Sequence, residues 1–299
     1  MKIIFFGLGS IGQKHARLIM TYFGHELYAY RTFLSSHNDP SQFFKNNITL
    51  LADQNTILEL KPDIAFITNP TDCHIQTALQ CAQHGMHLFI EKPISHINLD
   101  VCKLINTVQD KNLLAYVAYP LVFHPAVEPL LSRTFLPTDN IVFVCNTSLG
   151  NWRMYKTYSA SKDRGGGALL ELSHELYLAE RLLGRVLKIE GLIANESKEH
   201  TDAETYANLT LYHRSGCVSR VQLDINHWNE ERYMMINGQK YSIDTGRYDE
   251  MFLDQLRYFF DAVDKKKKGL YVNEINTLDS CYPLFEKIIN FRIEKRVKP

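Results

Sequence analysis

This sequence lacks the charge pattern that marks a nucleic-acid-binding or membrane-surface protein. Lysine plus arginine and aspartate plus glutamate are equal in number, at 33 each among 299 residues, so no net charge favours an anionic partner. The one dense run of charge, from Asp264 to Lys268, precedes Gly269 and is typical of a solvated turn after a helix. We therefore expect neither a nucleic acid nor a membrane among the partners.

Long apolar runs and paired cysteines are also missing. No apolar stretch reaches the roughly 20 residues of a membrane-spanning helix, and residues 1–6 run into glycine too early for the core of a secretion signal. The six cysteines form neither a Cys-x-x-Cys pair nor a cysteine–histidine spacing typical of zinc, so we expect free thiols and no metal site. These absences predict a cytoplasmic protein.

What the sequence does contain is enough apolar material for two domains, with 45% hydrophobic residues. Residues 1–120 alternate short apolar runs with helical patterns, which is typical of a doubly wound parallel sheet covered on both faces. The expected strands are 2–6, 25–30, 63–68, 87–90 and 115–118, and the expected helices are 11–22, 73–84 and 98–110.

A different pattern follows the prolines at 120, 125, 129 and 137, which suit a crossover between domains. Residues 121–299 are expected to form an α+β domain on a mostly antiparallel sheet, because alternating stretches follow one another closely. The expected strands are 141–149, 187–195, 206–213, 217–226, 233–236 and 241–244, and the expected helices are 169–183, 250–265 and 276–294.

A glycine motif lies between the first expected strand and the first expected helix. Gly7-Leu8-Gly9-Ser10-Ile11-Gly12 follows the Gly-x-Gly-x-x-Gly pattern, in which the glycines permit a tight turn, close approach of a pyrophosphate, and helix–strand packing. The N–H groups and positive dipole end of the helix would face the phosphates. This placement predicts a Rossmann domain, the N-terminal domain at 1–120, that binds a nicotinamide dinucleotide.

The end of the second expected strand bears on which cofactor is bound. NAD-preferring sites usually place Asp or Glu here to hold the ribose hydroxyls, whereas this chain has Arg31 and Thr32. A guanidinium would pair with a 2′-phosphate, and the Thr32 hydroxyl would add a donor. NADP is therefore the expected cofactor, with NAD still possible if Arg31 is only a surface residue.

Further motifs in the same order resemble the Gfo/Idh/MocA family of sugar and polyol oxidoreductases across nearly the whole chain. They are Ile67-Thr68-Asn69-Pro70-Thr71-Asp72-Cys73-His74, then Glu91-Lys92-Pro93, then Gly165-Gly166-Gly167 followed by Glu171 and His174. The resemblance implies that Thr68, Asn69, Pro70, His74, Glu91 and Lys92 line the cofactor, and that the Lys92–Pro93 peptide is often cis. It also implies hydride transfer between a nicotinamide and a secondary alcohol or ketone.

The resemblance assigns catalysis to Lys92, His174 and Glu171. The ammonium of Lys92 would stabilise negative charge on the substrate oxygen, and His174 would exchange the proton near neutral pH. Glu171, three residues earlier on the expected helix, would orient the imidazole. The family usually has Asp where this chain has Glu171, and its histidine usually lies at the position of Glu175. The sequence leaves open whether His174 or Glu175 fills the proton-transfer position.

Substrate contacts are expected around this centre. Tyr119 ends the fifth strand, although the Asn and Arg that usually follow it in the family are absent. Trp152, Arg153 and Tyr158, before the three glycines, offer ring faces and polar groups suited to a sugar. In this family the C-terminal sheet commonly pairs with another subunit, so a homodimer or homotetramer is expected.

The sequence thus predicts an NAD(P)-dependent oxidoreductase of a sugar, nucleotide sugar or polyol, with a role in surface-carbohydrate synthesis suggested by the resemblance of Ser173-His174-Glu175 to one branch of the family. One alternative is a regulator or sensor that kept the fold and the cofactor without turnover. Another is glycoside cleavage by transient oxidation. Neither the substrate nor the direction of the reaction follows from the sequence.

Overall fold

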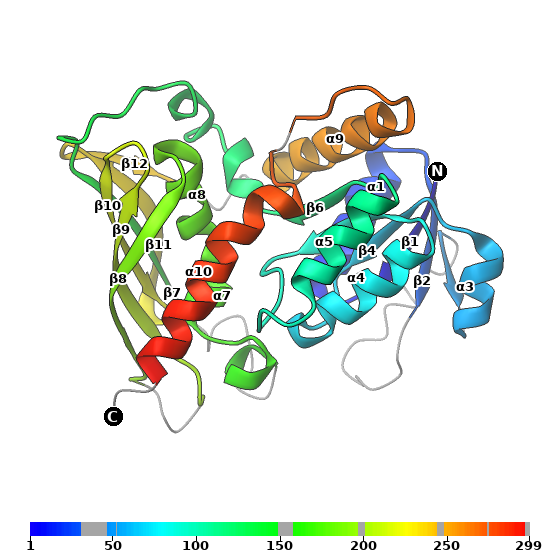
Figure 1. Ribbon diagram of the computed structural model, residues 1–299, viewed down its shortest axis with the longest axis horizontal. Helices are drawn as coiled ribbons and strands as arrows, with labels where there is room; N and C mark the ends of the chain where they lie inside the picture. Colours follow the sequence, from blue (N-terminus) through cyan, green and yellow to red (C-terminus); the bar gives the residue numbers. More distant parts are fainter. Residues whose placement is uncertain are drawn as a thin grey trace. The chain divides into compact units, whose positions relative to one another are not determined.

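The computed structural model describes residues 1–30, 47–51, 53–148, 158–196, 201–243, 248–273 and 275–296. This part of the chain forms two compact units, each containing its own six-stranded sheet (Figure 1). The first unit comprises Met1–Ser95, Leu99–Ala118 and Phe252–Ser280, and the second comprises His96–Asn98, Tyr119–Met251 and Cys281–Pro299.

The first sheet is parallel throughout, as the apolar runs predict. Its order is β3-β2-β1-β4-β5-β6, which is the Rossmann order. All residues of β4, β5 and β6 are buried, because helices cover both faces of the sheet. The order reverses between β1 and β4, so the carboxyl ends of these strands form the topological switch point. The strands are β1 (Lys2–Phe6), β2 (Glu26–Tyr30), β3 (Ile48–Leu51), β4 (Ile64–Ile67), β5 (His87–Glu91) and β6 (Ala115–Ala118).

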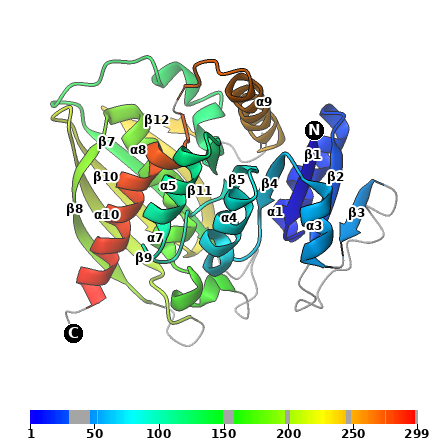
Figure 2. The same cartoon turned by 45° about the vertical axis from the view of Figure 1, so that its right-hand side comes forward.

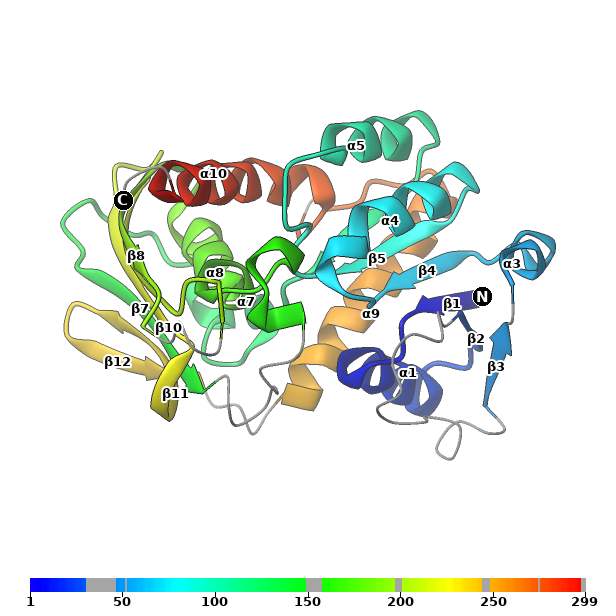
Figure 3. The same cartoon turned by 90° about the horizontal axis from the view of Figure 1, so that it is seen from below.

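Helices α4 (His74–Gln83) and α5 (Val101–Asp110) lie on one face of this sheet, and α1 (Ser10–Tyr22) and α9 (Tyr248–Lys267) lie on the other (Figure 3). Helix α9 follows the second sheet in the sequence, which is why a boundary at residue 120 assigns it to the second domain. In the structure, the Phe259 ring lies 5.1 Å from the ring of Phe89. Phe252–Ser280 belongs to the first compact unit, whereas a boundary at residue 120 would place it in the second domain.

Two short elements, β3 and α3 (Gln54–Leu60), were not expected from the sequence. They have four and seven residues, too few for a clear period. The local signal for α3 is its N-cap, since the Asp53 carboxylate accepts a hydrogen bond from Thr56 N at 2.9 Å.

The second sheet is mostly antiparallel, as expected, and contains one parallel pair, β7 with β10. Its order is β12-β11-β7-β10-β9-β8. Figures 1 and 2 show α7 (Ala168–Glu171), α8 (Ser173–Leu183) and α10 (Leu278–Arg296) on one face of this sheet. The strands are β7 (Ile141–Ser148), β8 (Val186–Ala194), β9 (Tyr206–His213), β10 (Val218–Asp224), β11 (Asn226–Ile236) and β12 (Gln239–Ser242). Short 3-10 turns occupy Thr71–Cys73, Pro120–Phe123, Glu128–Leu130, Tyr158–Ala160 and Lys162–Arg164.

The single helix expected at 169–183 is divided into two. Helix α7 ends at Glu171, Leu172 leaves the helical region with φ −104° and ψ 28°, and α8 begins at Ser173. The Ser173 hydroxyl donates to the carbonyl of Leu170 at 3.0 Å. Such local bonding by serine competes with the helical backbone and favours a break.

Among the described residues, no helix is both long and apolar enough to cross a membrane.

Candidate functional site

The glycine loop lies between β1 and α1, at the switch point of the parallel sheet. Gly9 is the N-cap of α1 and supplies no side chain to its first N–H groups, and the first turn contains no acidic residue. Gly9 and Ser10 are exposed. The positive end of the helix is therefore available to an anion, which is the arrangement that binds a pyrophosphate.

The three glycines of the motif have different surroundings. A Cβ on Gly7 would lie 2.8 Å from Asn69 Cα, and the φ of Gly7 is +101°. A Cβ on Gly12 would clash with the carbonyl oxygen of Gly7 and lie 2.9 Å from Thr68 Oγ1. A Cβ on Gly9 would have no heavy atom of the described residues within 4 Å. Gly7 and Gly12 thus serve close packing inside the protein, and the space at Gly9 remains for a ligand.

Thr68 and Asn69 follow β4 and lie beside the glycine loop. Thr68 Oγ1 donates to the Gly7 carbonyl at 2.6 Å, and Thr68 N donates to the Phe6 carbonyl at 3.0 Å. Asn69 Nδ2 donates to Thr77 Oγ1 at 2.9 Å, while Asn69 Oδ1 is buried without a hydrogen-bond partner among the described residues. A buried acceptor without a partner is costly, so Oδ1 fits a ligand hydroxyl. Together with the open space at Gly9, this acceptor shows that the residues present fit a dinucleotide.

His74 connects the two loops at this edge of the sheet and is 1% exposed. Its Nδ1 lies 2.9 Å from the Pro93 carbonyl oxygen and its Nε2 lies 2.9 Å from the Asn69 carbonyl oxygen. Burial lowers the pKa of the imidazole, and the two hydrogen bonds act in the opposite direction. Both ring nitrogens are engaged within the protein, where they hold the backbone around Asn69 and Pro93.

Lys92 and Pro93 follow β5, and the peptide between them is cis, as the family resemblance implies. Lys92 is half-buried, and its backbone N donates to Glu91 Oε2 at 3.2 Å. Glu91 is itself buried, with Oε1 2.8 Å from His15 Nε2 on α1. Glu91 therefore links the catalytic candidate Lys92 to the helix that follows the glycine loop.

His174 belongs to the second unit, at the second position of α8, and is half-buried. The Tyr119 ring meets it edge-on, with centroids 5.8 Å apart, and stacks on Tyr177 at 4.2 Å. Tyr119 is only 4% exposed. Its ring supports the imidazole of His174 and is covered by protein, which disfavours the expected substrate contact.

The two acidic neighbours of His174 have different surroundings. Glu171 is buried at the end of α7, and the break at Leu172 removes the expected continuous-helix spacing to His174. Glu175 is 1% exposed and forms an ion pair with Arg232 of β11, with Oε1 2.7 Å from Nε. The Glu175 carboxylate is thus engaged by a side chain of β11.

Several predicted site residues fall outside the described part of the chain: Arg31, Thr32, Trp152 and Arg153. Tyr158 is described and is half-buried in a 3-10 turn. Lys92 lies in the first unit, and Glu171, His174 and Tyr158 lie in the second.

Sequence reasoning missed His15, Thr77, Glu204, Arg232 and Arg292. His15 had a detectable signal, because it lies three residues after Gly12 and therefore on the buried face of α1. Arg232 and Arg292 had none, because their partners Glu175 and Glu204 are distant in the sequence.

Comparison with known proteins finds relatives in sequence and structures with the same fold. In Escherichia coli, 2,7-anhydro-N-acetylneuraminate hydratase is 23% identical over 190 residues, which cover 60% of this chain and 50% of that protein. The matches to curated relatives thus span about half the length of those proteins. A crystal structure of GenD2 from gentamicin A biosynthesis in complex with NAD superposes with a TM-score of 0.82 at 15% identity, over 99% of this chain and 93% of GenD2. The WlbA (WbpB) dehydrogenase from Thermus thermophilus, in complex with NAD and UDP-GlcNAcA, gives 0.77 at 17% identity, over 98% and 94%.

Two family models match different parts of the chain. The oxidoreductase family model with an NAD-binding Rossmann fold matches residues 1–119, and the Gfo/Idh/MocA C-terminal domain model matches residues 141–244. These matches cover both sheets and the loops that carry the glycines, Asn69, Lys92 and His174. This chain therefore belongs to the Gfo/Idh/MocA family of oxidoreductases.

Proposed function

We propose that this protein transfers a hydride between a nicotinamide dinucleotide, preferably NADP, and a CH–OH group of a sugar, nucleotide sugar or polyol. The observation that carries the proposal is the switch-point arrangement, in which the open glycine loop, Asn69 and Lys92 all follow the carboxyl ends of neighbouring parallel strands. Ligands of open α/β sheets bind at this position. Membership of the family establishes only that the protein is an oxidoreductase. The substrate class and the reaction are part of this proposal.

The N–H groups at the start of α1 would hold the pyrophosphate, and Asn69 Oδ1 would accept a hydrogen bond from a ribose hydroxyl. A nicotinamide bound there would supply the hydride acceptor or donor. Lys92 would place its ammonium against the substrate oxygen and stabilise the negative charge that develops on it. His174 would take the hydroxyl proton during oxidation or return it during reduction.

The sugar-like substrate class is supported by the named relatives. The solved structure of WlbA contains UDP-GlcNAcA, and the hydratase relatives are named for a sugar acid. The preference for NADP rests on Arg31, which follows Tyr30 in the sequence, whereas the solved structures of GenD2 and WlbA contain NAD. Arg31 thus distinguishes this chain's expected cofactor from the cofactor in those structures.

The first test is binding of NADPH and NADH to the wild-type protein and to Arg31→Ala, followed by nicotinamide fluorescence. We expect the substitution to weaken NADPH binding by about 1–3 kcal/mol, the value of a lost charge-assisted contact, and to leave NADH binding unchanged. Arg17→Ala, which removes an exposed arginine of α1, is the matched control. Equal loss of affinity for both nucleotides would exclude the 2′-phosphate role of Arg31.

The second test is absorbance at 340 nm in a screen of sugars, nucleotide sugars and polyols. On a substrate found in this way, Lys92→Met should lower kcat by about 10²–10³-fold, the effect of removing one group that stabilises an oxyanion. Lys103→Met, at an exposed position of α5, should leave kcat unchanged. Tight dinucleotide binding with neither redox change nor product formation on any sugar would instead support a regulator or sensor.

A second candidate is a redox-neutral reaction that starts with transient oxidation, because two of the curated relatives are named hydratases. In that case product would form from a sugar acid without net change in absorbance at 340 nm. Chromatography of the product alongside the absorbance trace separates the two candidates.

A further inference from the structure

The second unit contains a buried ion pair that neither the family motifs nor the proposed chemistry uses. Arg292 of α10 is 2% exposed, and Glu204, just before β9, is 5% exposed. Arg292 Nε donates to Glu204 Oε2 at 3.0 Å, and Arg292 Nη2 donates to the same oxygen at 2.8 Å. Nη2 also donates to the carbonyl of Gly166. One guanidinium thus connects the last helix, the segment before β9, and the three-glycine segment.

Glu204 also supplies the N-terminal cap of α7. The cap position is Gly167, which has no side chain to offer. Instead, the carbonyl of Glu204 accepts from Ala168 N at 2.8 Å, and its Oε1 accepts from Leu169 N at 3.4 Å. A residue 35 positions away therefore satisfies two N–H groups that a helix start leaves open.

The glycines are required by this packing. A Cβ on Gly167 would lie 2.5 Å from Glu204 Oε1 and 2.8 Å from Arg292 Nη2, and its φ is +110°. A Cβ on Gly166 would clash with the carbonyl oxygen of Ser159. The space beside both glycines is filled by the protein itself. This explains two of the three glycines without any approach of cofactor or substrate.

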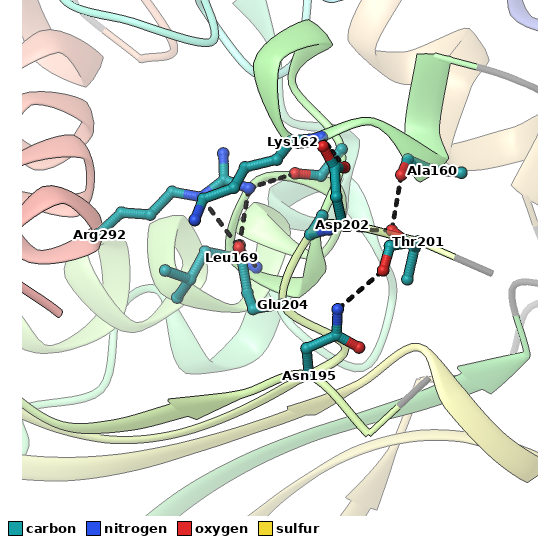
Figure 4. Close-up of polar contacts among 10 residues, drawn as sticks. Ala160, Lys162, Leu169, Asn195, Thr201, Asp202, Glu204 and Arg292 are labelled. Atoms are coloured by element: carbon teal, nitrogen blue, oxygen red, sulfur yellow. Dashed lines mark hydrogen bonds and ion pairs between the residues drawn. The ribbon is translucent and has the colours of Figure 1, made fainter. Parts of the chain in front are cut away.

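Figure 4 shows that the segment before β9, which bears Glu204, is also bonded to residues that precede the three glycines. Thr201 Oγ1 donates to the Ala160 carbonyl at 2.6 Å, and Lys162 N donates to Asp202 Oδ1 at 2.7 Å. Asn195 Nδ2 donates to the Thr201 carbonyl at 2.8 Å. The segment that bears Glu204 is therefore fixed to the chain both before and after the glycines.

We propose that Glu204 and Arg292 are positioning residues for His174: they fix the start of α7, and through this one-turn helix they set where α8 presents the imidazole. The proposal rests on the proposed role of His174 in proton transfer. A buried ion pair adds little net stability, because desolvation of both charges offsets their attraction. What the pair does provide is a single geometry, since the planar guanidinium makes directed bonds to two acceptors at once.

The test follows the ring resonances of His174 by NMR in protein labelled at histidine, with assignment from the spectrum of His174→Gln. Glu204→Gln keeps the size of the side chain and removes its charge. Gly167→Ala changes no charge, but its Cβ would displace the Glu204 and Arg292 side chains sterically. We expect both variants to shift the resonances and the titration midpoint of His174, because both displace the start of α7. Agreement between the two excludes a purely electrostatic effect of the lost charge.

Glu190→Gln is the matched control, since Glu190 forms an exposed ion pair with Lys188 at 2.6 Å in the same unit. His213 is the internal standard, because both its ring nitrogens are bonded to Gly184 O and Ser219 Oγ elsewhere in that unit. Should Glu204→Gln fail to fold, Arg292→Lys retains the charge with fewer directed donors and should still shift the His174 resonances relative to the wild type.

Unchanged His174 resonances in folded Glu204→Gln or Arg292→Lys, even with a lower unfolding midpoint, would overturn the proposal and leave the pair a purely structural role. Neither substrate nor cofactor is needed for the measurement. Its outcome therefore stays distinct from a failure of the proposed oxidoreductase activity.

Discussion

His87, the first residue of β5, is a buried histidine whose protonation couples the stability of the protein to pH. It is 7% exposed, and its Nδ1 accepts a hydrogen bond from Leu114 N at 3.0 Å. Burial, helped by the nearby ammonium of Lys267, lowers the pKa of the imidazole from 6.5 to about 4. The folded protein thus holds this ring neutral at pH values where the unfolded chain protonates it.

Stability should therefore fall as the pH decreases from 6.5 towards 4, since only the unfolded state binds the proton in that range. The shift corresponds to a loss of at most about 3 kcal/mol from this group. His87→Asn keeps an acceptor for Leu114 N and should show a smaller decrease over the same range. Urea unfolding at pH 6.5, 5.5 and 4.5 measures the free energy of unfolding of both proteins.

His84→Asn, at an exposed histidine after α4, is the control and should follow the wild type. Parallel curves for wild type and His87→Asn would show that other groups cause the acid sensitivity.

In the first unit, the sequence predicted the positions of the site residues that belong to a recognisable motif. Gly7, Gly9, Gly12, Asn69 and Lys92 all lie at the switch point. The sequence did not show that His74 is occupied by two carbonyl oxygens, because both partners come from loops that only the fold brings together.

At the scale of elements, two glycines of the same motif, at the start of α1, have different roles: Gly12 allows close packing, and Gly9 leaves space for a ligand. Gly12 packs against the loop itself, and Gly9 faces open space with φ −69°, which any residue adopts. Gly9→Ala should therefore leave the free energy of unfolding within about 0.5 kcal/mol of the wild type, as for other sites without contacts. It should nevertheless weaken dinucleotide binding, because a methyl group would occupy the phosphate approach.

Gly12→Ala should instead lower stability by about 1–3 kcal/mol, the cost of overpacking. Gly24→Ala is the control, since its Cβ would also have no neighbour within 4 Å in the described part of the chain. Thermal unfolding and nicotinamide fluorescence are both measured on all three variants. If Gly9→Ala binds NADPH as tightly as the wild type, the pyrophosphate does not approach that glycine.

Helix α8 shows where sequence periodicity was insufficient. The apolar pattern from 169 to 183 continues through Leu172, but the backbone breaks there. Tertiary bonds act together with the local bond of Ser173, because Glu204 caps α7 and Arg232 holds Glu175 in the first turn of α8. No local signal reports either partner.

At the scale of the whole molecule, the second sheet has a face directed away from its helices. Leu209 and Leu211 are buried, so the alternate positions of β9 point the other way. Leu192 pairs with Asn208 and Val218 pairs with Tyr212, which places both on that face with exposed fractions of 52% and 40%. We propose that this face mediates self-association, as expected for a homodimer or homotetramer.

Sedimentation velocity should then show an oligomer, and Leu192→Glu should weaken the association at least about tenfold, since each 1.4 kcal/mol changes an equilibrium constant by that factor. Leu270→Glu, at a leucine with a similar exposed fraction of 56% in the first unit, should not. A monomeric wild type, or an unchanged Leu192→Glu oligomer, would rule out this face.

The sequence by itself determined the two sheets, the family and the residues of the cofactor loop, because periodicity and the glycine motif are local properties of the chain. Only the tertiary structure decided that α9 joins the first unit, that Glu204 caps the start of α7, and that Glu175 is held by Arg232. It also decided that Gly166 and Gly167 pack against Ser159, Glu204 and Arg292. These features depend on contacts between residues far apart in the sequence, and no spacing along the chain encodes them.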